Sequence, residues 1–320
     1  MKQIKTISDQ VVKEASKIII GKEEQLRLVV MAVFCGGHVL LDDLPGVGKT
    51  TLVKVISRVL GCSSSRVQFT PDLLPSDIIG MNVFNQKTGD FSMLPGPVMA
   101  NLLLADEINR AIPRTQSALL EAMEELQVTV DGKTYPLPSP FLVLATQNPV
   151  EMESTFPLPI AQMDRFLIRL TLGYPTLEEE MVMLKTVGDE IPFDSLTPLL
   201  GPEEIGAIQR EIRNVHIEDK VLTYMLSLVE ATRKSESVRL PVSPRGTRAL
   251  YRAGKAWAAM NGRDFVTPDD ITALASYILP HRITLSNDAR LSGRTPQSIV
   301  AEILAGAVAP GGKEEILSGQ

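Results

Sequence analysis

The sequence contains few cysteines and few histidines. Among its 320 residues are two cysteines, Cys35 and Cys62, and three scattered histidines, His38, His216 and His281. The two cysteines have no metal-binding spacing, and nothing in their number indicates a disulfide framework or an oxidising compartment. We therefore expect the cysteines to be small buried residues and the histidines to be structural.

The chain also lacks the features of a secreted or membrane protein. Residues 1–10 are polar and have no apolar core of the kind found in a secretory signal. The longest apolar runs fall well short of the roughly 18 residues that a membrane-spanning helix needs. We therefore expect a cytoplasmic protein with no membrane span.

Basic residues do not predominate. The chain has 32 Lys and Arg against 38 Asp and Glu, which gives a formal net charge of −6. Because nucleic-acid binding depends on clustered Lys and Arg, this balance argues against a protein whose main task is to hold a polyanion. The composition, 44% hydrophobic and 22% charged, is that of an ordinary globular protein.

Short apolar runs alternate with helical patterns in the first half of the chain. The runs are residues 38–41, 67–69, 102–105, 141–145 and 166–170. Runs of this kind are typical of parallel strands that are buried on both faces, so we predict an α/β fold with a five-stranded parallel sheet. The helices that alternate with them are predicted at about 48–60 and 113–126.

Two predicted hairpins interrupt this alternation, at residues 81–93 and 127–137. The first turns at residues 87–90, and the second turns at Asp131-Gly132, a strong turn signal. The hairpins are not needed to close an α/β core, so they are candidates for contact with another molecule. Surface hairpins without a binding role are the alternative.

The pattern changes after residue 174. Residues 203–214, 219–234, 244–260 and 268–279 all have helical patterns, with no strand expected between them. Thr267 and Ser243 are well placed to cap two of these helices, because each is followed directly by proline. We predict an α/β core at 1–174, a linker at 175–198, and an all-α domain with a C-terminal tail at 199–320.

The strongest functional signal is the segment Pro45-Gly46-Val47-Gly48-Lys49-Thr50, which follows an apolar strand and precedes a helix. Glycines allow backbone N–H groups to curl around phosphate oxygens, a lysine reaches the β- and γ-phosphates, and a threonine hydroxyl ligates Mg²⁺. The strict phosphate-loop pattern has glycine at position 43, where this chain has Asp43. We predict that ATP is bound by Leu44, Pro45, Gly46, Val47, Gly48, Lys49, Thr50 and Thr51.

A pair of carboxylates follows the apolar strand at 102–105. In phosphate-loop enzymes a metal ion and a water-orienting group are both required. We predict that Asp106 binds Mg²⁺ together with Thr50, and that Glu107 polarises the attacking water. Without the phosphate loop, an Asp-Glu pair after a strand would indicate a solvated helix cap.

Three further polar residues are candidates for the same site. Asn148 follows the strand at 141–146 and either marks a turn or bonds the γ-phosphate or the attacking water. Arg165 either forms an ion pair within its own subunit or reaches a neighbour's site. Arg245, close to the cap Ser243, either points to the phosphate or is an ordinary surface arginine.

Together these residues resemble an AAA+ ATPase, and more closely the MoxR family. The likeness is carried by residues 38–46, 105–110, 115–125, 145–149, 157–166, 243–246 and 279–282, and extends from about 20 to 303. The resemblance implies a P-loop AAA+ core followed by an all-α lid, and it makes an acidic residue at position 43 acceptable. The two hairpins would match the helix-2 insert and the hairpin before sensor 1.

The resemblance also implies roles and partners. Lys49 and Thr50 would form Walker A, Asp106 and Glu107 Walker B, Asn148 sensor 1 and Arg245 sensor 2. Arg165 would be the arginine finger that acts on the adjacent subunit, with Arg110 and Arg114 as alternatives. The catalytic set is then Lys49, Glu107, Asn148, Arg165 and Arg245, in a homo-oligomeric ring that is most often a hexamer. Members of this family help to assemble or activate protein complexes, often with a partner that bears a von Willebrand factor A domain.

Two other functions compete with this chaperone-like one. Related AAA+ rings that act as nucleic-acid motors or magnesium-chelatase subunits carry the same two inserts, yet the hairpin tips here offer mainly Lys87 and Lys133 beside Asp90 and Asp131. That balance favours protein clients over nucleic acid. A nucleotide-dependent scaffold that does not hydrolyse ATP is the third function, and the presence of Glu107 argues against it.

Overall fold

The chain forms two compact units. The computed structural model describes residues 1–43, 46–87, 89–147, 155–188 and 190–308. The sheet unit comprises residues 7–158 and 170–208, and the helical unit comprises residues 1–6, 159–169 and 209 onward. The domain limits inferred from the sequence, 1–174, 175–198 and 199–320, remain a prediction.

The sheet unit is built on the five-stranded parallel sheet that the apolar runs predict. Its strands are β1 (Val39–Asp42), β2 (Ser64–Gln68), β5 (Leu102–Asp106), β8 (Leu142–Gln147) and β9 (Ile168–Leu170), in the order β2-β5-β8-β1-β9. Leu40 pairs with Ala145, which pairs with Ala105, so β1, β8 and β5 end at one edge. The apolar residues of β1 and β5 are buried because both faces of the sheet are covered.

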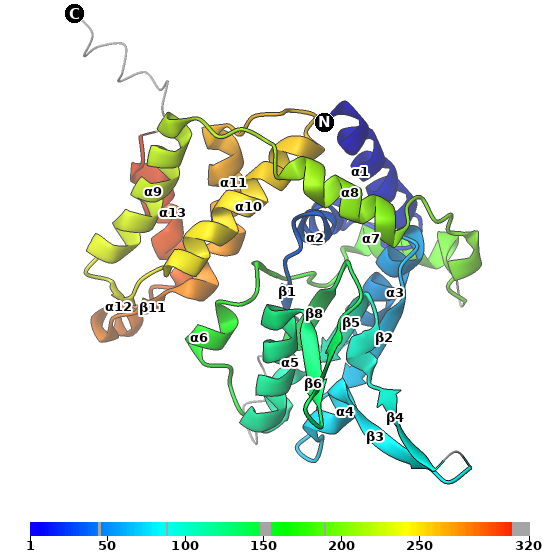
Figure 1. The fold of residues 1–320 in the computed structure, drawn as a ribbon. Coiled ribbons are helices and arrows are strands. Elements are labelled where there is room, and N and C mark those ends of the chain that lie inside the picture. The colour runs from blue at the N-terminus through cyan, green and yellow to red at the C-terminus, as the bar shows by residue number, and fades with distance from the viewer. Residues whose placement is uncertain (44–45, 88, 148–154, 189, 309–320) are drawn as a thin grey trace, which may run out of the picture. The chain divides into compact units, whose positions relative to one another are not determined.

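Helices surround this sheet (Figure 1). They are α2 (Glu23–Cys35), α3 (Lys49–Val59), α4 (Pro75–Ile79), α5 (Pro113–Glu125) and α7 (Leu177–Thr186), with short 3₁₀ turns at Pro97–Met99, Ile108–Arg110 and Phe193–Ser195. Most of α1 (Lys2–Ala15) and α8 (Pro202–Ile212) also belongs to this unit, and the rest of each belongs to the helical unit. The segment expected to be a linker contains α7, which starts with a capping box between Thr176 and Glu179. That reciprocal pair satisfies two backbone donors and explains why a helix begins there.

Both predicted hairpins are present in the sheet unit. The first is β3 (Gly80–Asn85) with β4 (Asp90–Pro95), and the second is β6 (Gln127–Val130) with β7 (Lys133–Pro136). Figure 1 shows the first hairpin extending away from the rest of the unit. Phe84 and Phe91 face each other across it with ring centroids 5.2 Å apart. Asn82 donates a 2.9 Å hydrogen bond to Asp131, which joins the two hairpins.

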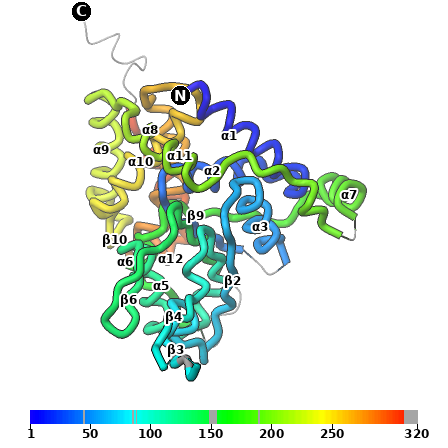
Figure 2. The backbone as a smooth tube through the Cα atoms, turned by 45° about the vertical axis from the view of Figure 1, so that its right-hand side comes forward, coloured from blue at the N-terminus to red at the C-terminus, as the bar shows by residue number. Residues whose placement is uncertain are grey.

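The helical unit contains all the helices predicted after position 215. Its elements are α6 (Ile160–Met163), α9 (Asp219–Lys234), α10 (Pro244–Met260), α11 (Pro268–Ile278), α12 (Asn287–Leu291), α13 (Pro296–Gly306) and a 3₁₀ turn at Pro280–Arg282. Figure 2 shows α9, α10 and α11 side by side, and the three contact one another. A β-carbon at Gly254 would lie 2.9 Å from Ile271, so glycine permits the close packing of α10 on α11.

The expectation that no strand lies between these helices is wrong. β10 (Val238–Leu240) pairs antiparallel with β11 (Thr284–Leu285). Each strand has at most three residues, which is too short for an alternating pattern to reveal, and the two are far apart in sequence. The ribbon connects the turn after α9 to the segment before α12.

Three further expectations can be compared with the structure. Cys35 and Cys62 are half-buried thiols, and burial raises the pKa of Cys62 to about 11, so this thiol is protonated at neutral pH. His38 is buried, and its ring bonds the backbone of Met123 and Val143, which is a structural role. In the part of the chain that the structure describes, no helix has the length and apolarity to cross a bilayer.

We predict that Asp270→Ala destabilises the helical unit by about 3 kcal/mol, since it removes a buried carboxylate that pairs with the partly buried Arg263 and caps α11. Asp270 is buried and accepts two bonds from the Arg263 guanidinium, at 2.7 and 2.6 Å, as well as the N–H of Thr267 at 2.8 Å. Trp257 is the only tryptophan and lies on α10, so its fluorescence during urea unfolding reports on this unit.

The matched control is Asp269→Ala, in the same helical turn but exposed. It should cost no more than about 1 kcal/mol, the scale of a carboxylate at a helix N-terminus. Equal losses in the two variants would show that the Arg263 pair contributes nothing of its own.

Candidate active site

The loop between β1 and α3 has the backbone that the phosphate-binding prediction requires. Gly46 and Gly48 have φ angles of +87° and +85°, a conformation that strongly favours glycine. Open space lies beside both positions, since a β-carbon built at either one meets no atom within 4 Å. Helix α3 begins at Lys49, so its first N–H groups are available to an anion. Leu44 and Pro45 lie outside the described residues.

Lys49 lies against this loop. Its ammonium donates a 3.3 Å hydrogen bond to the backbone oxygen of Asp43, and its side chain is buried. Thr50 occupies the first turn of α3 and is half-buried, while Thr51 lines an adjoining apolar pocket. The lysine, the hydroxyl and the helix N-terminus are therefore brought together.

Asp43, the departure from the strict motif, fastens the loop to another segment. Its carboxylate is buried and accepts the backbone N–H groups of Leu172 at 2.8 Å and Gly173 at 2.9 Å. Charge-assisted bonds of this kind are about twice as strong as neutral ones. An acidic residue is accommodated at position 43 because both of its oxygens have backbone donors.

The predicted acidic pair ends the neighbouring strand β5, and one hydroxyl fixes both members. Thr146 of β8 donates a 2.7 Å hydrogen bond to Asp106 and accepts the backbone N–H of Glu107 at 2.8 Å. Glu107 has a φ of +56°, a strained conformation for a residue with a side chain. Such strain persists only where the surroundings over-determine it, and here Thr146 supplies part of that constraint.

Each carboxylate of the pair also has a positively charged neighbour. Arg66 of β2 contacts Asp106 at 2.8 Å, and Arg110 contacts Glu107 at 2.9 Å. Gln68 donates a further 2.8 Å bond to Glu107. Both arginines are partly exposed, so they can exchange these bonds for solvent.

Gln116 of α5 holds the chain that follows Glu107. Its buried amide nitrogen contacts the carbonyl oxygens of Ile108 and Ala111, each at 3.1 Å, and of Phe156 at 2.8 Å. Phe156 in turn donates its N–H to the Asn109 carbonyl at 2.6 Å. A residue of α5 thereby fixes the segment that follows β5 and the acidic pair.

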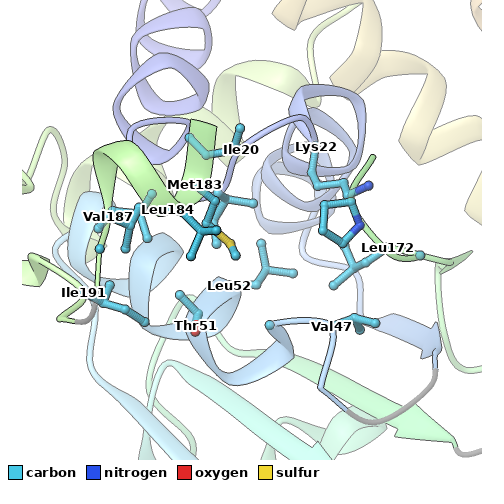
Figure 3. Close-up of a pocket in the computed structure, with 16 residues that line it drawn as sticks. Ile20, Lys22, Val47, Thr51, Leu52, Leu172, Met183, Leu184, Val187 and Ile191 are labelled. Carbon is cyan, nitrogen blue, oxygen red and sulfur yellow. The ribbon is translucent and has the colours of Figure 1, made fainter. Parts of the chain in front are cut away.

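An apolar pocket of about 350 Å³ adjoins the phosphate loop (Figure 3). It is lined by Ile18, Ile19, Ile20, Lys22, Val47, Gly48, Thr51, Leu52, Leu172, Gly173, Pro175, Met183, Leu184, Val187, Gly188 and Ile191. At its rim Lys22 contacts Glu179 at 3.7 Å and the carbonyl of Tyr174 at 3.3 Å. The volume and the mainly apolar lining suit a largely apolar group such as a purine base.

The residues present also fit Mg²⁺ that arrives with a nucleotide. Thr50 and Asp106 offer the hard oxygen donors that Mg²⁺ prefers, and Mg²⁺ is usually bound through one or two carboxylates plus substrate phosphates. Within the described ranges, no group of three or more His, Cys, Asp and Glu side chains could hold a metal ion by itself.

The remaining predicted residues are not placed at this site. Arg165 follows α6, and Arg245 lies exposed in the first turn of α10, so both belong to the helical unit. Asn148 lies outside the described residues. The roles of all three stay predictions.

Two family models match the chain. Residues 38–168 match the ATPase family associated with various cellular activities (AAA), and residues 230–303 match the AAA lid domain. The first range contains the phosphate loop and the acidic pair, and the second contains Arg245.

Relatives of nearly the same length are also found. The protein YeaC of Bacillus subtilis is 48% identical over 93% of both chains. Chaperone MoxR1 of Mycobacterium tuberculosis is 39% identical over 93% of this chain and 81% of its own. The crystal structure of a protein from Cytophaga hutchinsonii, whose sequence is 38% identical, superimposes on this chain with a TM-score of 0.90. The superposition covers 96% of each chain.

We predict that Thr146→Val lowers ATP turnover by about 10- to 100-fold, the usual cost of losing a residue that orients a metal or catalytic ligand. Valine is similar in size but cannot bond Asp106 or the Glu107 N–H. Thr146→Ser keeps the hydroxyl and serves as the control, with steady-state phosphate release as the measurement. Wild-type turnover in the valine variant would mean that the acidic pair does not depend on this hydroxyl.

Proposed function

Because the chain belongs to the MoxR family of AAA+ ATPases, we propose that it hydrolyses ATP in a Mg²⁺-dependent reaction and uses the energy to assemble, activate or remodel protein complexes. One observation carries the ATPase part of this proposal. Thr146 bonds both Asp106 and Glu107, at the sheet edge where the phosphate loop also begins.

The proposed chemistry relies on positioning and charge, as in phosphoryl transfer generally. Lys49 and the N–H groups of the loop bind the β- and γ-phosphates, and the apolar pocket receives the base. Thr50 and Asp106 would hold Mg²⁺, whose charge would neutralise that of the phosphates. Glu107 orients and polarises the attacking water through Oε1, since the bonds from Arg110 and Gln68 both end on Oε2. Asn148 and Arg245 contact the γ-phosphate in this scheme.

Catalysis in the proposed ring, expected to be a hexamer, also requires a neighbouring subunit. Arg165 acts as the finger, and a finger supplied in trans raises the rate by roughly 10³ to 10⁵. Arg110 is a weaker candidate because it pairs with Glu107 of its own chain at 2.9 Å. Arg114 remains an alternative at the same boundary. Specific activity should then depend on assembly.

A protein client is favoured over nucleic acid by the surface of the first hairpin. Phe84 and Phe91 are 50% and 72% exposed, and Met81 and Leu94 are exposed beside them. Exposed apolar groups of this extent are typical of protein interaction sites. The name of the relative Chaperone MoxR1 agrees with this part of the proposal. The proposal also includes a partner that bears a von Willebrand factor A domain, and a cytoplasmic location for the protein.

We predict that Glu107→Gln binds ATP with an affinity within a few-fold of wild type but loses at least 100-fold in turnover, because the amide cannot polarise water. Lys49→Ala should instead lose ATP binding. Binding of a fluorescent ATP analogue and steady-state phosphate release separate the two effects. Phosphate release by Glu107→Gln at the wild-type rate would remove Glu107 from the reaction.

The remodelling function can be tested by capture. Glu107→Gln held in ATP should retain a partner or client during affinity purification from the native cell, whereas Lys49→Ala should not. Mass spectrometry should identify a von Willebrand factor A protein or an immature enzyme with the trap alone. Recovery of DNA with replication proteins instead would make this chain a nucleic-acid motor.

A further inference from the structure

One carboxylate in the helical unit joins the segments that carry Arg165 and Arg245. Asp164, the residue before Arg165, accepts a 2.8 Å bond from Nε of Arg282 on one oxygen. Its other oxygen accepts a 2.6 Å bond from the hydroxyl of Ser243. Three segments therefore meet at the side chain of Asp164, namely 157–166, 243–246 and 279–282. All three carry the family resemblance in the sequence, which gives no role to Asp164 or Arg282.

Arg282 fixes the backbone on the far side of Arg165. Its guanidinium is almost wholly buried and donates to the carbonyl oxygens of Phe166 and Leu167, and to Ile278 on α11. Burial lowers the pKa of Arg282 to about 10, so it remains charged at neutral pH. The planar guanidinium group donates in several fixed directions, so it is suited to holding these carbonyl groups in a defined geometry. A buried ion pair adds little net stability, so stability alone does not explain its presence.

Ser243 extends the connection to Arg245. Its hydroxyl oxygen accepts the backbone N–H groups of Arg245 at 3.1 Å and Gly246 at 3.4 Å, which caps α10, while its proton goes to Asp164. Gly246 makes the contact sterically feasible. A β-carbon there would lie 2.7 Å from Cδ of Arg282, closer than packed carbon atoms approach.

We infer that Asp164, with Arg282 and Ser243, is a positioning group that sets Arg165 and Arg245 as one unit. This inference rests on the proposed function, in which Arg165 reaches the neighbour's ATP and Arg245 reaches the chain's own ATP. Arg165 is covalently next to Asp164, and Arg245 is bonded to the hydroxyl that Asp164 holds. A network of charge-assisted bonds around the buried Arg282 is stiff, so a displacement of one arginine moves the other.

The function of this group would be communication around the ring. A change in the contacts of Arg245 with the chain's own nucleotide alters the position in which Arg165 meets the neighbour's nucleotide. The converse holds as well, because coupling between two binding events is reciprocal. Asp164 itself need touch neither nucleotide.

The first test uses Asp164→Asn, which keeps the size of the side chain but cannot accept both the Arg282 and Ser243 donors. We expect kcat to fall by about 10- to 100-fold, as for a small misplacement of catalytic groups. The Kd for an ATP analogue should change by less than about threefold. Ser243→Ala should lower kcat in the same way and Ser243→Thr should restore it, while Asp288→Asn on the exposed start of α12 is the neutral control.

A role confined to stability gives a different result. The melting temperature of Asp164→Asn would then fall while kcat per assembled ring stayed at the wild-type value, and that outcome would overturn the inference. Absence of ATP hydrolysis by wild-type protein, or full turnover by Arg165→Ala, would instead contradict the proposed function on which the inference depends. The two failures are therefore distinguishable.

The second test separates the two arginines by mixing subunits. Lys49→Ala subunits cannot turn over ATP but carry an intact Arg165, so they should restore turnover to Arg165→Ala subunits next to them. They should restore only part of the turnover of Asp164→Asn subunits, whose own Arg245 stays misplaced. Restoration to the same level in both mixtures would show that Asp164 acts through Arg165 alone and would overturn the link to Arg245.

Discussion

The register that joins β1, β8 and β5 determines the geometry of the candidate site. Because the pairing brings the carboxyl ends of these strands to one edge, the start of the phosphate loop and the acidic pair lie at the same edge of the sheet. Thr146 belongs to β8, the strand between β1 and β5, and its hydroxyl bonds the carboxylate of Asp106 and the N–H of Glu107. The strand pairing therefore fixes the positions of both acidic residues. A slip of one residue would turn its hydroxyl to the other face of the sheet.

Buried charge is used in both units to connect segments that are distant in sequence. Asp43 ties the phosphate loop to residues 172 and 173, and Asp164 ties three segments of the helical unit. Such groups add little net stability compared with apolar packing, but they are intolerant of misplacement because an unpaired buried charge is costly. Their presence beside proposed catalytic residues is therefore better explained by a need for defined geometry.

The sequence predicted the parts of this structure that have a local signature. Apolar runs identified four strands of the sheet but only the last two residues of β2, whose sequence is mostly polar. Asp131-Gly132 identified a hairpin, and the glycines at 46 and 48 identified the loop. What it missed depends on contacts between distant residues. In the sequence, Gln116 is not distinguishable from other polar helix residues, and Thr146 is not distinguishable from other strand residues. The strands β10 and β11 are too short to produce an alternating pattern. The apolar pocket is assembled from segments at 18–22, 47–52 and 172–191, none of which indicates a base site by itself.

Helix α7 shows what this pocket implies for the fold. None of its described residues is buried, yet Met183, Leu184 and Val187 face the apolar pocket, and Leu177 and Met181 are exposed. A helix in a protein normally gains most of its stability from packing its apolar side chains. A base bound in this pocket would supply apolar contacts for these side chains. If the proposed site receives a nucleotide base there, the local order of α7 would depend on whether the site is occupied.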